Sequence, residues 1–332
     1  MPKNYFHTGI KQCFDEQGFE ITCDQSPQDA FFCSGLSWPE PRFKVENENT
    51  VQDLLTDITW TAKANFFNFP LTWPEALEAV SALNREGFAG HSDWRLPNRR
   101  ELRSLVSHGA RKPALPPGHP FTDVFLGWYW TSTTAAISPA HAWYIHFEGG
   151  RMFYGNKAQR YLVWPARGNP RHVPATGQHG CYDLQGKNIS CRGSGQDGEF
   201  KLGHPWPRPR FKKNKGLITD QLTDLVWLNP AEIKKEPVSW IQALEIVREL
   251  DSGRHWRLPN INELESLVDA SAHSPALPAE HPFSGLEDGY WSSTTSFFEP
   301  DWAYVLYLDK GAVGVGFKPG TDFFVWPVCD RS

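Results

Sequence analysis

Apolar residues recur at helical spacing in two segments of the chain that resemble each other. Thr72-Trp73-Pro74-Glu75 and Ser239-Trp240-Ile241-Gln242 have the pattern of capping boxes, in which a hydroxyl and a Glu or Gln satisfy the free N–H groups of the first turn. The apolar positions on one face of each segment are Trp73, Ala76, Leu77, Val80 and Leu83, and Trp240, Ala243, Leu244, Val247 and Leu250. We predict two amphipathic helices whose apolar faces belong to the core.

A shorter helix is predicted after each copy of the pentapeptide WRLPN, at residues 94–98 and 256–260. Asn98 and Asn260 are the expected N-caps, and a glutamate follows three residues later in both copies. The positions expected to be buried are Leu102, Leu105 and Val106, and Leu264, Leu267 and Val268.

The pattern after the second helix is that of strands. Apolar and polar residues alternate from Ala142 to Phe147, a turn is expected at Gly149-Gly150, and strands resume over 152–154 and 161–164. The second copy has turns at 309–311 and 319–320. The sequence therefore predicts an α+β fold in each copy, with two helices early and antiparallel hairpins late.

The chain matches itself almost from end to end, at an offset that drifts from 168 to 161. Thr8-Gly9, Cys13 and Cys23 recur as Thr176-Gly177, Cys181 and Cys191, and Val163-Trp164-Pro165 recurs as Val325-Trp326-Pro327. We predict a tandem duplication with units at 1–168 and 169–332, each with its own cysteine-containing leader. Each half is expected to close its own aromatic-lined interior.

Composition excludes some classes of function. Thirty-three Lys and Arg against 38 Asp and Glu give a net charge of −5, which offers no overall field for a nucleic acid. No apolar run approaches the roughly 18 residues of a membrane span, and Met1 to Phe6 lack the hydrophobic stretch of a signal peptide. We expect neither a nucleic-acid partner nor a membrane span.

The six cysteines suggest an oxidising compartment. Cys13 and Cys23, and Cys181 and Cys191, are ten residues apart without the spacing of a zinc site, so two local disulfides are expected. Cys33 and Cys329 have no counterparts in the other copy. They are expected to form a third disulfide or to remain as two buried thiols.

The order of these motifs resembles a bacterial family. WRLPN before a capped helix, then Tyr-Trp with a Ser/Thr run, then hairpins ending in Val-Trp-Pro, is similar to the domain of unknown function 1566, also called the C-terminal domain of the Legionella collagen-like adhesin. The resemblance implies a C-type-lectin-like fold related to formylglycine-generating enzymes. It also implies binding at a surface, in one branch of sulfated polysaccharides, and a disulfide-containing leader typical of secreted proteins.

Residues that differ between the copies mark where a ligand surface could have diverged. Arg99, Arg100 and Arg103 are expected on the exposed side of the second helix, where the other copy has Ile261, Asn262 and Glu265. With Arg111 and Lys112 they would form a basic patch for sulfate or carboxylate groups. A second basic cluster, between Arg208 and Lys215, is equally open to either a binding or a merely solvated role.

No chemistry beyond binding is indicated by the sequence. No set of His, Cys and Asp keeps the spacing of a metal site, and no cofactor or catalytic residue is expected. A formylglycine-type oxidase would need a reactive cysteine pair, for which Cys33 and Cys329 are the only candidates. The prediction is an extracytoplasmic binding protein, adhesin-like and directed to anionic polysaccharide. The alternative is a structural or protein-binding accessory of a fibre, pilus or phage particle.

Overall fold

The computed structural model describes residues 4–24, 26–233, 236–250 and 253–331. The first half contains β1 (Cys13–Phe14), β2 (Glu20–Ile21), α1 (Asp29–Phe32), β3 (Phe43–Val45), β4 (Thr50–Asp53), β5 (Ile58–Thr61), α2 (Trp73–Glu86), η1 (Phe88–Gly90), α3 (Arg99–Ser104), β6 (Trp128–Thr134), β7 (His141–His146), β8 (Arg151–Asn156) and β9 (Ala166–Arg167). The second half contains β10 (Cys181–Tyr182), β11 (Asn188–Ile189), α4 (Asp197–Phe200), β12 (Phe211–Asn214), β13 (Leu217–Asp220), β14 (Leu225–Leu228), η2 (Pro230–Glu232), α5 (Trp240–Arg248), α6 (Ile261–Ser266), β15 (Gly289–Thr295), β16 (Trp302–Tyr307), β17 (Ala312–Phe317) and β18 (Val328–Asp330).

The four predicted helices are α2, α3, α5 and α6, and all four begin with a capping box. The caps are Thr72, Asn98, Ser239 and Asn260, each followed three residues later by a Glu or Gln that reaches back to the cap's N–H. The α+β prediction is confirmed, because the same order of helices and antiparallel strands occurs in both halves.

Some strands differ from the prediction. Three strands, β3 to β5, precede α2, and together with β9 they form a four-stranded sheet; β12, β13, β14 and β18 form the equivalent sheet of the second half. The segment 161–164 forms only isolated bridges from Tyr161 to Leu71 and from Leu162 to Tyr129. Its side chains pack against neighbouring elements instead of continuing a ladder, and the last strand begins only at Ala166.

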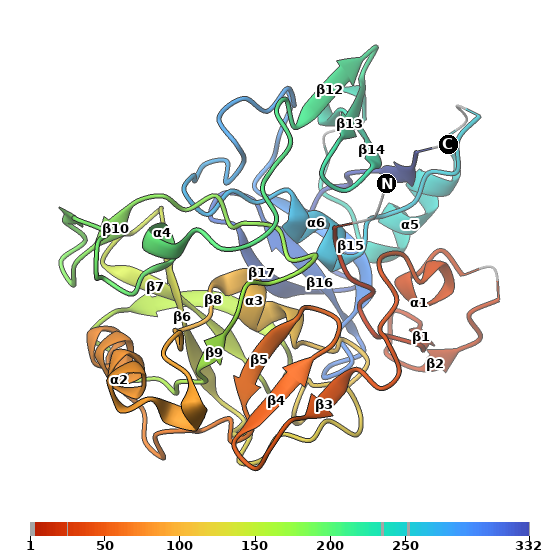
Figure 1. The fold of residues 1–332 in the computed structure, drawn as a ribbon. Coiled ribbons are helices and arrows are strands. Elements are labelled where there is room, and N and C mark those ends of the chain that lie inside the picture. The colour runs from red at the N-terminus through yellow and green to blue at the C-terminus, as the bar shows by residue number, and fades with distance from the viewer. Residues whose placement is uncertain (1–3, 25, 234–235, 251–252, 332) are drawn as a thin grey trace.

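The two halves are joined by one six-stranded antiparallel sheet in the order β15-β16-β17-β8-β7-β6 (Figure 1). Strands β17 and β8 meet at Val313 and Met152. Alternate residues of β7 point to opposite faces, so Ala142 packs against α2 and Trp143 packs on the side of α3. Helices α2 and α5 therefore cover one face of this sheet, and α3 and α6 cover the other.

The expectation that each half closes its own interior is wrong. One cluster of buried side chains includes Leu102 and Met152 from the first half together with Leu264 and Val313 from the second. The clusters beneath α2 and α5, and a small one around Cys329, each belong to a single half. The cause is the β8–β17 pairing, which places α3 and α6 side by side over a continuous sheet.

The leaders are exchanged between the halves. We name residues 4–39 leader one, 40–168 core one, 169–207 leader two and 208–331 core two. Helix α1 of leader one packs against β15 of core two, and α4 of leader two packs against β6 of core one. Figure 1 shows β10 and α4 beside β6 and β7, with β1, β2 and α1 at the opposite side of the molecule.

Equivalent polar contacts hold both exchanged leaders. Asp197 of leader two accepts hydrogen bonds from Thr176 and from Thr133 of core one, both at 2.7 Å. Lys157 of core one donates to the carbonyl of Tyr182 at 3.0 Å. In the other pairing, the corresponding hydrogen bonds join Asp29 to Thr8 and Thr294 at 2.7 Å, and Lys318 to the carbonyl of Phe14 at 3.3 Å.

Candidate binding surfaces

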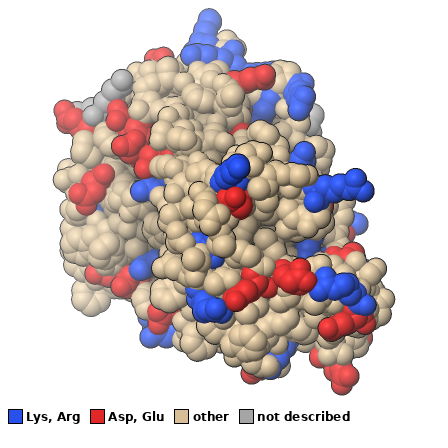
Figure 2. Space-filling view, turned by 90° about the vertical axis from the view of Figure 1, so that its left-hand side faces the viewer, with Lys and Arg blue, Asp and Glu red and all other residues tan. Residues whose placement is uncertain are grey.

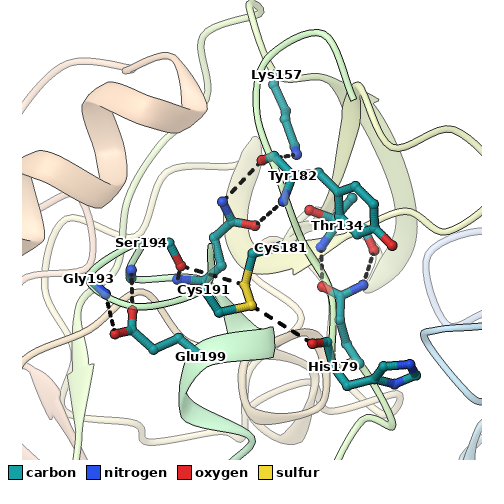
Figure 3. The surroundings of a disulfide bond; sticks show 12 residues. Thr134, Lys157, His179, Cys181, Tyr182, Cys191, Gly193, Ser194 and Glu199 are labelled. Carbon is teal, nitrogen blue, oxygen red and sulfur yellow. Dashed lines mark hydrogen bonds between the residues drawn. A yellow bond between two sulfur atoms is a disulfide. The ribbon is translucent and has the colours of Figure 1, made fainter. Parts of the chain in front are cut away.

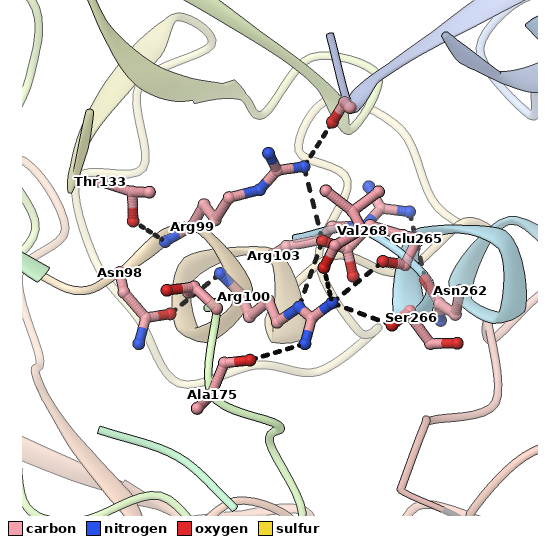
Figure 4. Close-up of polar contacts among 12 residues, drawn as sticks. Asn98, Arg99, Arg100, Arg103, Thr133, Ala175, Asn262, Glu265, Ser266 and Val268 are labelled. Carbon is pink, nitrogen blue, oxygen red and sulfur yellow. Dashed lines mark hydrogen bonds and ion pairs between the residues drawn. The ribbon is translucent and has the colours of Figure 1, made fainter. Parts of the chain in front are cut away.

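The three arginines predicted to form a surface patch are buried. Arg99, Arg100 and Arg103 are 1%, 5% and 5% exposed, so the expectation that they face solvent is wrong. Helix α3 is covered on one side by the six-stranded sheet and on the other by α6 of core two. Figure 4 shows the three guanidinium groups pointing from α3 toward α6.

The guanidinium groups are held by acceptors of core two. Glu265 is the carboxylate in their midst, and its Oε1 lies 3.5 Å from Arg99 Nη2 and 3.5 Å from Arg100 Nε. Burial lowers the pKa of Arg99 to about 10. All three arginines also donate hydrogen bonds to core two. Arg99 donates to the carbonyl of Gly311 (2.5 Å), Arg100 to the carbonyls of Val268 (2.7 Å) and Ser266 (3.0 Å), and Arg103 to the side chain of Asn262 (3.2 Å).

This cluster joins the two cores and is not an exposed surface for an anionic ligand. One signal in the sequence could have indicated it: position 103 is arginine in one copy, and the equivalent position 265 is glutamate in the other. Opposite charges at equivalent positions attract each other where two related units meet face to face. The burial itself could not be predicted, because it depends on the packing of one core against the other.

Arg111 and Lys112 are exposed and do not join the three buried arginines in one patch. Lys112 Nζ lies 3.8 Å from Glu148 and 5.3 Å from the ring centroid of Phe298. The guanidinium of Arg111 lies 5.6 Å from the ring centroid of Phe297. The five predicted residues are thus divided between an interface and a loop.

A cavity of about 690 Å³ lies where leader two meets core two. The indole of Trp206 lines it, with its Nε1 donating to the carbonyl of Ala175 at 2.8 Å and the guanidinium of Arg210 4.8 Å from its ring centroid. Arg210 is itself paired with Asp220. Side chains of both signs also line the cavity: Lys201, Arg208, His179, Asp269 and Glu280.

The basic hairpin formed by β12 and β13 continues from this cavity. Phe211 lines the cavity, and Lys212, Lys213 and Lys215 follow it as exposed side chains. Lys213 Nζ donates to the carbonyl of Pro282 at 3.3 Å, just past the loop that closes the cavity. Figure 2 shows Lys and Arg side chains at the top of the molecule, the end where Figure 1 places β12.

The two cores match a known family. The sequence pattern of the Lcl C-terminal domain matches residues 49–167 and again residues 216–329. The chain belongs to the Lcl C-terminal domain family. A comparison with curated proteins finds no match.

The two Lcl C-terminal domain matches cover the cores and stop short of the leaders. Residues 175–211, which form most of the wall around Trp206, lie between the two matched segments. The family resemblance predicted from the sequence is confirmed, and it indicates an extracellular, adhesin-like module. The surface around Trp206 is therefore built largely from residues outside the two segments that match the family.

The two predicted disulfides of this Lcl C-terminal domain protein are present. Cys13 is bonded to Cys23 and Cys181 to Cys191. Figure 3 shows the second disulfide beside Gly193 and Ser194. These bonds fit an oxidising location outside the cytoplasm.

The expected third disulfide and the alternative of two buried thiols are both wrong. Cys33 and Cys329 are both free, and only Cys329 is buried. Cys329 lies in strand β18 against Val226 and Trp256. Cys33 ends α1 on the surface of leader one, where its thiol contacts the carbonyl of Ala30 at 3.1 Å.

Iodoacetamide is expected to label one thiol of the native protein at alkaline pH, because Cys33 is accessible and Cys329 is buried. Burial raises the pKa of both thiols, so labelling of Cys33 will be slow near pH 7. Peptide mapping by mass spectrometry should find the label on Cys33, and on Cys329 only after unfolding. Equal labelling of both residues in the native state would contradict these positions.

Within residues 4–24, 26–233, 236–250 and 253–331, no group of three or more His, Cys, Asp or Glu side chains could hold a metal ion. Over the same part of the chain, no helix has the length and apolarity to cross a bilayer.

Proposed function

We propose that this protein is a non-catalytic, extracytoplasmic binding module that holds an anionic polysaccharide at the junction of leader two and core two. The observation that carries the proposal is the cavity around Trp206 with the exposed lysines of the β12–β13 hairpin beside it. An indole offers a flat apolar face for a sugar ring, and ammonium groups attract sulfate or carboxylate substituents. None of the buried arginines of α3 lines this cavity, although Arg100 supports its wall, 5.9 Å from the ring centroid of Trp206.

The equivalent hairpin in core one supports this choice of surface. Lys44 is its single exposed lysine, and Glu46 and Glu48 stand near the positions where core two has Lys215 and its neighbours. The positive charge has therefore accumulated on one copy of a duplicated element. A charge difference of this kind is what a site that has diverged for anionic ligands requires.

Heparin tests the proposal as a sulfated probe, with neutral dextran as the uncharged comparison. The variant Lys212→Glu with Lys213→Glu is expected to bind immobilised heparin at least tenfold more weakly than the unmodified protein, because two attractive charges become repulsive. Surface plasmon resonance at a fixed ionic strength measures this change.

The matched control changes the equivalent region of the other copy. Lys11→Glu with Lys44→Glu alters the net charge equally, on exposed side chains at positions equivalent to His179 and Lys212. This control is expected to keep its affinity for heparin. Equal weakening by both variants would show that only net charge matters, and it would overturn the assignment of the site.

A further inference from the structure

A second concave site lies between helix α2 of core one and leader two. This groove has a volume of about 540 Å³, within the range of ligand pockets. Its apolar surface is formed by Leu77 from α2 and by Leu184, Ile189 and Phe200 from leader two. The last three are 38%, 37% and 41% exposed, so the groove presents apolar side chains to solvent.

Small residues open the groove on this side of the duplicated molecule. Gly195 of leader two lies where leader one has Pro27, and Ser81 of α2 lies where α5 has Arg248. Gly195 has φ +70°, and a Cβ there would already be in contact with Leu77 at 3.5 Å. The equivalent site between α5 and leader one thus carries larger side chains at these two positions.

The loop that forms one wall is rigidly held. Glu199 accepts hydrogen bonds from the backbone N–H groups of Gly193 at 2.6 Å and Gly195 at 2.7 Å (Figure 3). The disulfide between Cys181 and Cys191 ties the base of the same loop. Because Glu199 occupies these N–H groups, the loop is not a cradle for an anion.

Carboxylates outnumber unpaired guanidinium groups in the lining of the groove. Three line it: Asp183, Glu199, which accepts from the loop N–H groups, and Glu78, which also pairs with the exposed Arg85 at 2.6 Å. The lining guanidinium of Arg95 is buried and paired in a bidentate manner with Glu101. The lining side chains therefore present negative charge around an apolar floor.

We propose that this groove binds a short peptide segment that carries lysine or arginine next to apolar side chains. The apolar floor accommodates the apolar residues, and the carboxylates at the rim attract the cationic ones. Sugar recognition is less well served, because Trp73 and Trp94 are only 2% exposed and offer no free indole face. The site is distinct from the proposed polysaccharide surface around Trp206.

The probe is a fluorescein-labelled, acetylated peptide of alternating Lys and Leu, with a Glu-Leu peptide as the comparison. Fluorescence anisotropy of the full chain is expected to show saturable binding of the Lys-Leu peptide and none of the Glu-Leu peptide. Glu78→Lys reverses a rim charge and Ser81→Arg introduces the residue found in the other copy, both at exposed positions of α2. Each is expected to weaken binding at least tenfold.

The matched control is Glu245→Lys, the same change at the equivalent exposed position of α5. It should leave the affinity for the Lys-Leu peptide unchanged. The proposal would be overturned if the unmodified protein did not bind the peptide, or if Glu78→Lys and Glu245→Lys weakened binding equally. Displacement of the peptide by maltoheptaose would also overturn it. Heparin binding of the Ser81→Arg variant is expected to be normal, which separates this test from that of the polysaccharide surface.

Discussion

Replacing Glu265 by glutamine is expected to lower the free energy of unfolding by about 3–5 kcal/mol, the usual cost of removing one partner of a buried ion pair. Glu265 is the carboxylate within 3.5 Å of both Arg99 and Arg100, and all three residues are buried between the two cores. Glutamine keeps the shape of the side chain but removes the carboxylate nearest to the two buried guanidinium groups. Urea unfolding followed by tryptophan fluorescence measures the loss.

The control for this variant is Glu280→Gln, which removes a carboxylate from an exposed position and is expected to change stability by less than about 0.5 kcal/mol.

A second comparison also removes one of the guanidinium groups that Glu265 pairs with. Glu265→Gln combined with Arg99→Ile, the residue found at the equivalent position 261, should be less destabilised than the sum of the single changes. A loss below about 1 kcal/mol for Glu265→Gln alone would contradict a role for this carboxylate in joining the cores.

Raising the pH from 7 to 9 is expected to stabilise the fold through Lys157 and Lys318. Burial lowers the pKa of each amine from 10.5 to about 7, against the opposing effect of nearby Asp183 for Lys157 and of Asp15 and Asp301 for Lys318. Between these pKa values the unfolded chain binds more protons than the folded one, so stability rises with pH. The cost of burying the charged amines is present in full below about pH 7 and is relieved toward pH 10.5. Each lysine contributes at most about 1.4 kcal/mol per pH unit.

The comparison variant is Lys157→Met with Lys318→Met, in which this contribution to the pH dependence is removed. Asp29 and Asp197 have pKa values raised to about 6 by burial, so they are ionised in both states above pH 7 and add no slope there. Urea unfolding at half-unit steps between pH 7 and 9 should give a smaller rise in stability for the variant. Parallel profiles for the two proteins would show that these amines stay protonated in the folded state.

The local elements of this fold could be predicted from the sequence because their signals are local. Capping boxes such as Asn98 with Glu101 mark where each helix begins, and the spacing of Cys181 and Cys191 indicated a disulfide that the structure contains. The family match follows from the same repeated motifs. The strands before α2 were missed because they are short and lie next to loop-like sequence.

The arrangement of the units could not be predicted, because the two leaders carry the same anchoring residues. Asp29 and Asp197 each accept from a threonine of a core, and Lys157 and Lys318 each donate to a leader carbonyl. These anchoring residues do not distinguish the two possible pairings, so the sequence does not say which pairing occurs. The burial of Arg99 could not be predicted for a similar reason. The polar face of a short helix is expected to be exposed to solvent unless the packing of a second unit against it is known.

The crossing of the leaders has a consequence for any half-length fragment. Residues 1–168 would contain core one together with leader one, which packs on core two in the full chain. In this fragment, the edge of β8 and the surface of core one that binds a leader would both be uncovered. Two such fragments could cover these surfaces only by forming a twofold-symmetric dimer in which each leader packs on the core of the other fragment. The 332-residue chain thus has the architecture of a homodimer whose subunits exchange their leaders. Here both subunits are parts of one polypeptide, so the covalent link takes the place of subunit association.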